Sequence, residues 1–69
     1  MIKKLRLVRI AQGYPAYKFV AMIGIHPNLL RKVELGLREP TKKVMLKSCD
    51  ILKRPPSELF TDAEEALVR

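Results

Sequence analysis

The sequence predicts an all-α fold in which five short helices form one domain. Apolar residues recur at helical spacing in five stretches, and no stretch alternates between apolar and polar residues as a half-buried strand does. Glycines and prolines separate the stretches at positions where helices commonly end and begin. Helices this short are marginal alone, so we expect mutual packing to stabilise them.

The first expected helix covers residues 2–11. Leu5, Val8 and Arg9 lie on one face of it. It can end near Gly13, because glycine accepts the left-handed backbone conformation that terminates many helices.

Two further helices are expected on either side of a tight turn. Residues 15–23 form the first of them and stop at Gly24, and residues 27–35 begin the second at a proline. Proline suits the first turn of a helix, since its missing N–H has no partner to lose there. The inward residues expected for this pair are Phe19, Val20, Ile23, Leu29, Leu30 and Val33.

The fourth helix is expected over residues 42–52, with Thr41 as its N-cap. A proline pair then ends it and starts a final short turn within residues 55–60. The inward residues expected for the fourth helix are Met45, Leu46, Cys49 and Leu52.

The charge of the chain favours a polyanionic partner. Lys and Arg number 14 against 7 Asp and Glu, a formal net charge of +7. Residues 1–33 hold basic side chains and no acidic one, whereas most charges in residues 58–69 are acidic. A folded domain with one basic end attracts nucleic acids, of which DNA is the commonest, although RNA-binding and membrane-surface proteins share such basicity.

Catalysis, metal binding and a membrane span find no support in the sequence. One His and one Cys exclude most metal sites, and no Gly-rich phosphate loop or nucleophile motif is present. We therefore expect no catalytic residue, no metal and no cofactor. The apolar runs are too short to cross a bilayer and the single Cys cannot form an internal disulfide, so a cytoplasmic protein is expected.

Two short helices joined by a Gly-containing turn at residues 24–26 have the helix-turn-helix arrangement. Further residues fit one signature without a gap from about residue 5 to residue 60. They are Phe19-Val20, Gly24-Ile25, Leu30, Val33-Glu34, Gly36, Arg38, Pro40-Thr41, Leu52 and Glu58-Leu59-Phe60. With these residues the chain resembles the lambda-repressor-like (Cro/cI, XRE-type) helix-turn-helix family.

The resemblance implies a sequence-specific transcriptional regulator, a repressor or Cro-like protein, that binds double-stranded DNA with residues 27–35 in the major groove. Asn can bond to adenine, and Arg or Lys to guanine, while a leucine can touch a thymine methyl or serve only in packing. The base-contacting residues implied at the start of this helix are Asn28, Arg31, Lys32 and Leu29.

Phosphate contacts are expected from the start of the second helix and from the loop after the third. Ala16 stands where the family often has a phosphate-binding glutamine, so that contact would pass to backbone amides or to its neighbours. The phosphate-contacting residues expected are Ala16, Tyr17, Lys18, Arg38, Lys42 and Lys43.

The resemblance also implies an inward-facing ion pair between Arg9 and Glu34, which would link the first helix to the third as architecture. In contrast, Pro15 and His26 stand where the family usually caps helices with Ser or Thr, and Lys53 stands where glycine is expected. Several apolar residues expected on the surface hint at a partner: Leu7, Ile10, Met22, Leu35 and Leu37.

We expect a DNA-binding domain over residues 1–60 and an acidic tail or short extra helix over residues 61–69. The tail offers Ala63, Ala66, Leu67 and Val68 as an apolar strip for dimerisation or for another protein. A homodimer on DNA is expected. The alternatives are an antitoxin-like or other protein-interaction module, for which DNA binding would be secondary, and nonspecific or RNA binding.

Overall fold

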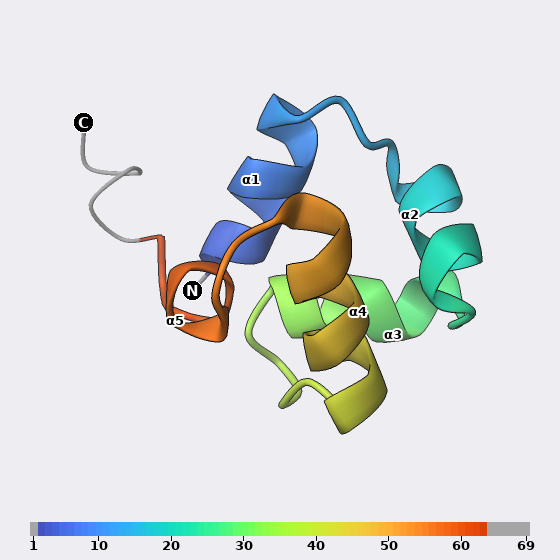
Figure 1. Ribbon diagram of the computed structural model, residues 1–69. Coiled ribbons are helices and arrows are strands. Elements are labelled where there is room, and N and C mark those ends of the chain that lie inside the picture. The colour runs from blue at the N-terminus through green and yellow to red at the C-terminus, as the bar shows by residue number, and fades with distance from the viewer. Residues whose placement is uncertain (1, 64–69) are drawn as a thin grey trace.

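The computed structural model describes residues 2–63 and confirms the all-α prediction. It contains α1 (Lys4–Ala11), α2 (Ala16–Ile23), α3 (Pro27–Glu34), α4 (Lys42–Leu52) and α5 (Pro56–Leu59). In Figure 1, α4 crosses in front of α3, α2 stands on one side, and α1 and α5 lie on the other. Helix α1 packs against α3, α4 and α5, α2 packs against α3 and α4, and α4 also packs against α5. Every helix therefore has at least two neighbours.

One apolar core joins all five helices. Its buried members are Leu5, Phe19, Val20, Ile23, Leu30, Val33, Leu52 and Leu59. The expected inward residues of the first three helices are among them, except that Val8 and Leu29 are half-buried at the edge of the core. Hydrophobic burial of this kind is what makes eight-residue helices stable in a small domain.

The predicted inward face of α4 is partly wrong. Val44, Ser48 and Leu52 are the buried residues of this helix, whereas Leu46 is 60% exposed and Met45 is half-buried. The two candidate faces are rotated by about one residue on a helix of 3.6 residues per turn. The buried face includes Ser48, so it holds fewer apolar residues than the expected face. A prediction based on the number of apolar residues therefore selects the expected face and not the buried one. Cys49 packs at the edge of the core, where burial raises the pKa of its thiol.

The N-terminal residues pair with the segment that follows α5. The Lys4 N–H donates to the Thr61 carbonyl (2.9 Å), and the Ala63 N–H donates to the Ile2 carbonyl (2.8 Å). Residues 2 and 3 are therefore outside α1, which begins two residues later than expected. In Figure 1 the N-terminus accordingly lies beside α5.

The beginning of the expected tail belongs to this arrangement. Ala63 is fully buried and so offers no surface to a partner, and the Lys3 Nζ donates to Asp62 Oδ1 (2.8 Å). That hydrogen bond lowers the pKa of the Asp62 carboxyl. The remaining residues of the expected apolar strip, Ala66, Leu67 and Val68, lie outside the described residues.

A buried ion pair joins α1 to α3. Arg9 Nε donates to Glu34 Oε2 (2.8 Å) and Arg9 Nη2 donates to Glu34 Oε1 (3.2 Å), so both carboxylate oxygens are occupied. The two side chains are only 8% and 7% exposed. Arg9 Nη1 also donates to the Tyr14 carbonyl (2.7 Å) in the loop before α2. This is the pair implied by the family resemblance, and it connects three segments of the chain.

Helix α4 ends in a strained residue that a neighbouring helix supports. Lys53 has φ 57° and ψ 42°, the left-handed conformation that glycine adopts most easily. The Gln12 side chain reaches across from the end of α1 and donates to the Leu52 carbonyl (2.9 Å), satisfying a group that the helix leaves free.

Glu34→Gln is expected to lower the free energy of unfolding by about 3–5 kcal/mol, because it leaves the Arg9 guanidinium buried without a counter-charge. Urea denaturation followed by circular dichroism measures this. Glu58→Gln is the matched control. It breaks only the exposed i,i+4 pair of Glu58 with Arg54 and should cost less than about 0.5 kcal/mol. Equal losses in the two variants would contradict a structural role for the buried pair.

Lys53→Gly is expected to raise the free energy of unfolding by roughly 0.5–1 kcal/mol. Relief of the left-handed strain, about 1–2 kcal/mol, exceeds the extra chain entropy that glycine brings to the unfolded state. Lys47→Gly, which removes an exposed lysine inside the same helix, should instead lose about 1 kcal/mol. Melting of the two variants side by side checks the sign of each change, and destabilisation by both would show that Lys53 is not strained.

Candidate nucleic-acid interface

The turn between α2 and α3 is short and tightly bonded. Gly24 closes α2 at φ 84° and ψ 43°, and its N–H donates to the Val20 carbonyl (2.7 Å). The Ile25 N–H donates to the same carbonyl (3.2 Å), and the next residue is already the N-cap of α3. Since Gly24 has a positive φ, a side chain at this position would be strained. The two helices thus meet in the three-residue turn predicted from the sequence.

The start of α3 is capped by an unusual residue. His26 Nδ1 accepts a hydrogen bond from the Asn28 N–H (3.1 Å), which replaces the serine or threonine hydroxyl expected in the family. Pro27 occupies the first turn of the helix, as predicted. Both features fix the direction in which the first turn of α3 points.

Helix α3 has two sharply different faces. Leu30, Val33 and Glu34 are buried, whereas Asn28, Arg31 and Lys32 are exposed. Its acidic residue is therefore turned inward and paired, so the outer surface of α3 carries only neutral and positive side chains. Leu29 differs from the other three implied base-contacting residues, because it is half-buried and packs against the core.

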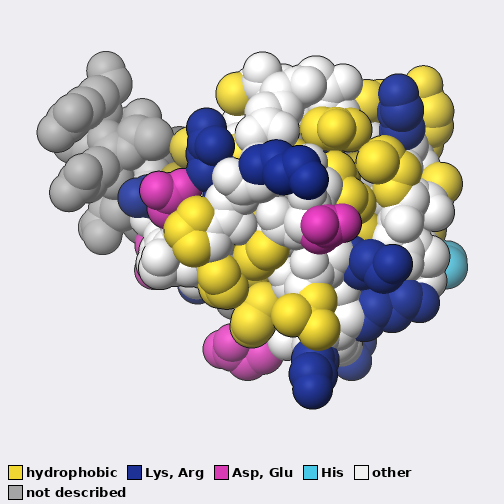
Figure 2. Space-filling model, viewed as in Figure 1, with side chains coloured by type: hydrophobic (Ala, Val, Ile, Leu, Met, Phe, Trp, Pro, Cys, Tyr) yellow, Lys and Arg dark blue, Asp and Glu magenta, His cyan; other side chains and the backbone are white. Residues whose placement is uncertain are grey.

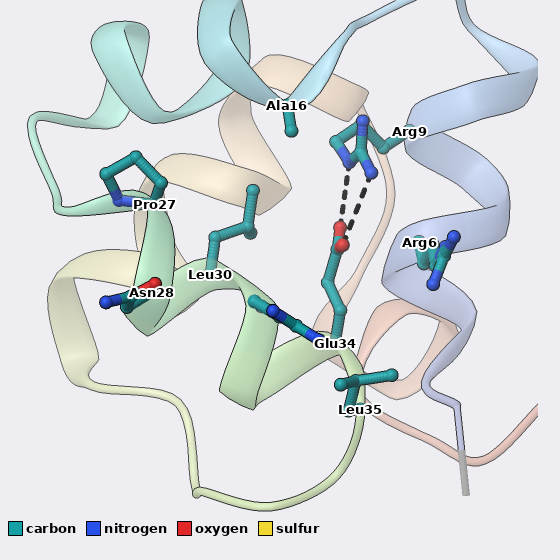
Figure 3. Close-up of a pocket in the computed structure, with 9 residues that line it drawn as sticks. Arg6, Arg9, Ala16, Pro27, Asn28, Leu30, Glu34 and Leu35 are labelled. Carbon is teal, nitrogen blue, oxygen red and sulfur yellow. Dashed lines mark hydrogen bonds and ion pairs between the residues drawn. The ribbon is translucent and has the colours of Figure 1, made fainter.

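The exposed side of α3 forms a ridge between two hollows. A hollow of about 470 Å³ separates α3 from α1 and from the start of α2, and a second of about 330 Å³ lies toward Leu37. Asn28, Arg31 and Leu35 line both hollows, at helical spacings of three and four residues. In Figure 3, Asn28 lies on the outer side of α3, while Arg9 and Glu34 meet between α1 and α3.

Two of the segments expected to bind phosphate border this ridge, the start of α2 at one hollow and the loop after α3 at the other. Ala16 is the first residue of α2, where the N-cap Pro15 provides no side-chain hydrogen bond, so the first amides of α2 lack intrahelical and capping partners. Tyr17 (77% exposed) and Lys18 follow on the same turn. Arg38 is exposed in the loop after α3, and Lys42 is exposed at the start of α4. Figure 2 shows several Lys and Arg side chains gathered on the side of the molecule where the histidine lies.

Lys43 has an internal role that the sequence did not reveal. Its Nζ donates to the Gly24 carbonyl (3.1 Å), which joins the start of α4 to the turn between α2 and α3. The ammonium thereby lies at the C-terminal end of α2, where a positive charge is favourable. Lys43 is thus a support for the turn in the free protein, and Lys42 is the freer of the two lysines.

Arg6 was not among the predicted site residues, yet it lines the larger hollow with Arg9 and Arg31. Figure 3 shows Arg6 on α1, across from the C-terminal half of α3. The sequence carried only a weak signal for it, which was its place three residues before Arg9 in the acid-free part of the chain.

Within residues 2–63, no three His, Cys, Asp or Glu side chains are grouped so that they could hold a metal ion. None of the helices in this part of the chain is long and apolar enough to span a membrane.

In a comparison with known protein families, the chain matches a family described as helix-turn-helix over residues 2–59. Neither the curated proteins nor the solved structures contain a match to the chain. The family match covers all five helices of the structure, including the turn and the outward ridge of α3. The chain therefore belongs to the lambda-repressor-like, XRE-type helix-turn-helix family of DNA-binding regulators.

Proposed function

We propose that this protein is a sequence-specific transcriptional regulator of the repressor or Cro type, which reads duplex DNA with α3 in the major groove. The observation that carries the proposal is the ridge on α3, where Asn28 and Arg31 stand exposed between two hollows. A helix that enters a groove needs such a projecting edge, with room on either side for the groove walls.

Electrostatics supports the same orientation. A carboxylate facing DNA would be repelled by the phosphates, and the acidic residue of α3 is buried and bonded to Arg9. The exposed part of the helix keeps Arg31 and Lys32. The helix can thus approach a polyanion without losing a favourable contact of its own.

Each exposed residue at the start of α3 has a chemical role in this proposal. Asn28 would bond to adenine through its side-chain amide, and Arg31 and Lys32 would donate to guanine O6 and N7. The exposed part of Leu29 would contact a thymine methyl, while the rest of this side chain packs against the core. The role of His26 is to hold the first turn through its bond to the Asn28 amide.

Phosphate contacts would position α3 without reading sequence. The free amides at Ala16 and Tyr17 and the side chain of Lys18 would bind one strand at the start of α2. Arg38 and Lys42 would bind on the other side of α3, and Lys43 would keep the turn rigid while its remaining N–H groups face solvent.

We also propose that the protein acts in the cytoplasm as a homodimer on DNA. One helix of this length contacts few base pairs, so a second copy on a two-fold operator would supply the rest of the specificity. The two half-sites would then lie about one helical turn apart. In this proposal residues 1–60 form the DNA-binding domain, and the acidic segment over residues 61–69 would serve dimerisation or another partner.

Selection of bound duplexes from a random pool is expected to give a defined motif arranged as an inverted repeat. Asn28→Ala and Arg31→Ala should each relax the preference at particular base pairs in each half-site, at a cost of about 1–3 kcal/mol in discrimination. The measurement is sequencing of the selected pools, followed by binding titrations at one salt concentration.

Arg54→Ala is the matched control for this selection, because it removes an exposed arginine at the end of α4 and should leave the motif unchanged. A uniform loss of affinity in Asn28→Ala and Arg31→Ala, with the motif intact, would instead show that these residues contact phosphates. A pool without any motif, or equal binding to duplex DNA and heparin, would overturn the proposed function.

A further inference from the structure

The larger hollow beside α3 is lined by more positive than negative side chains. Base reading by α3 does not account for this excess of positive charge. The hollow measures about 470 Å³ and is lined by Arg6 of α1, by Arg31 of α3, and by the paired Arg9 and Glu34. Both oxygens of Glu34 accept from Arg9, so this carboxylate is fully engaged inside the protein. Within residues 2–63, neither Arg6 nor Arg31 has a hydrogen-bond or ion-pair partner. Two positive side chains thus face one hollow without a compensating acid.

We propose that Arg6 binds a backbone phosphate of duplex DNA in this hollow. The inference rests on the proposed function, because it uses the placement of α3 in the major groove. It adds a DNA-binding residue on α1, whereas the other contacts proposed above come from α2, α3, the loop after α3 and the start of α4.

The relative sizes of helix and groove place Arg6 at the DNA backbone. An α-helix with its side chains is about 10–12 Å across, and the major groove of B-form DNA is about 12 Å wide. One helix therefore fills the groove, and a neighbour packed against its side lies over a row of phosphates. Helix α1 is such a neighbour, since it packs against α3 and is tied to it by the buried ion pair.

The chemistry of the hollow suits a phosphate. A guanidinium can donate two parallel N–H bonds to phosphate oxygens, and such charge-assisted bonds are the stronger kind. Ala16, at the α2 end of the hollow, has a methyl group and no side-chain donor, which leaves the space open. Arg6 then supplies a free side-chain donor to this hollow from α1, while Arg31 projects with Asn28 toward the base edges.

The test compares Arg6→Gln with Arg54→Gln, which removes the same charge between α4 and α5, outside the hollow. Binding to one duplex is titrated at several salt concentrations. For Arg6→Gln we expect roughly 10-fold weaker binding at about 0.1 M salt, since a hydrogen bond between charged groups is lost. The slope of log K against log salt should fall in magnitude by about 0.9, the value for one phosphate contact. Both residues are exposed, so both variants should melt like the wild type.

A second measurement identifies the phosphate. Duplexes with a single neutral methylphosphonate at successive positions are titrated with wild type and with Arg6→Gln. At one phosphate beside the half-site, the wild type should lose roughly 10-fold in affinity, whereas Arg6→Gln should lose nothing further. The Arg54→Gln variant should respond as the wild type does at every position.

The outcomes separate this inference from the proposed function. Equal salt slopes for Arg6→Gln and Arg54→Gln, or loss of preference at one base pair in Arg6→Gln, would overturn the phosphate contact and leave the reading helix in place. A reduced slope in a protein that selects no motif would support the phosphate contact and overturn sequence-specific regulation. Absence of any duplex binding by the wild type would overturn both.

Discussion

The buried ion pair between Arg9 and Glu34 is the interaction on which the rest of the molecule depends. It joins α1 to the end of α3 through two hydrogen bonds, and a third bond from Arg9 reaches the Tyr14 carbonyl in the loop before α2. A pair of this kind adds little net stability when both partners are present, because both charges must leave water. The bidentate contact also constrains geometry, since both of its hydrogen bonds form only when α1 and α3 are correctly placed relative to each other. The same contact removes the carboxylate of α3 from the outer surface.

Further hydrogen bonds at the two ends of α3 also fix its position. At its start, the His26 side chain caps the Asn28 amide, and the turn before it is tied to α4 by the bond from Lys43 to the Gly24 carbonyl. At its end, the Lys3 N–H donates to the Glu34 carbonyl (2.8 Å). An eight-residue helix is therefore held at both ends and along its inner face. Side chains that read bases need a rigid support of this kind, because small errors of position break bidentate hydrogen bonds.

The charges of the molecule are sorted in a way that serves the same surface. The exposed acids near the end of the described chain include Glu58 and Asp62, and each lies beside a basic partner, Arg54 and Lys3. These two acids are on α5 and on the segment after it, while exposed Glu39 follows Arg38 in the loop after α3. On α1, α2 and α3 the exposed charged side chains are all basic, whereas α4 carries exposed lysines together with Asp50. A field of this shape would attract DNA and orient the domain as it approaches.

Local residue patterns were enough to predict the five helices, the turn at Gly24 and the exposure of Asn28 and Arg31, whereas the left-handed end at Lys53 was expected from the family resemblance. Prolines and glycines act on their own backbone, and a strongly amphipathic helix such as α3 has one possible inner face, so these features need no information about distant residues. The pair of Arg9 and Glu34 came from the family resemblance. The inner face of α4 was missed because the other face is richer in apolar residues, and only packing against α1, α2 and α5 selects the face with Val44 and Ser48. The bond from Lys43 to Gly24, the pairing of residues 61–63 with the N-terminus and the hollow beside Arg6 each join residues far apart in the chain. Such contacts depend on how the helices are placed in space, and a one-dimensional pattern does not contain that placement.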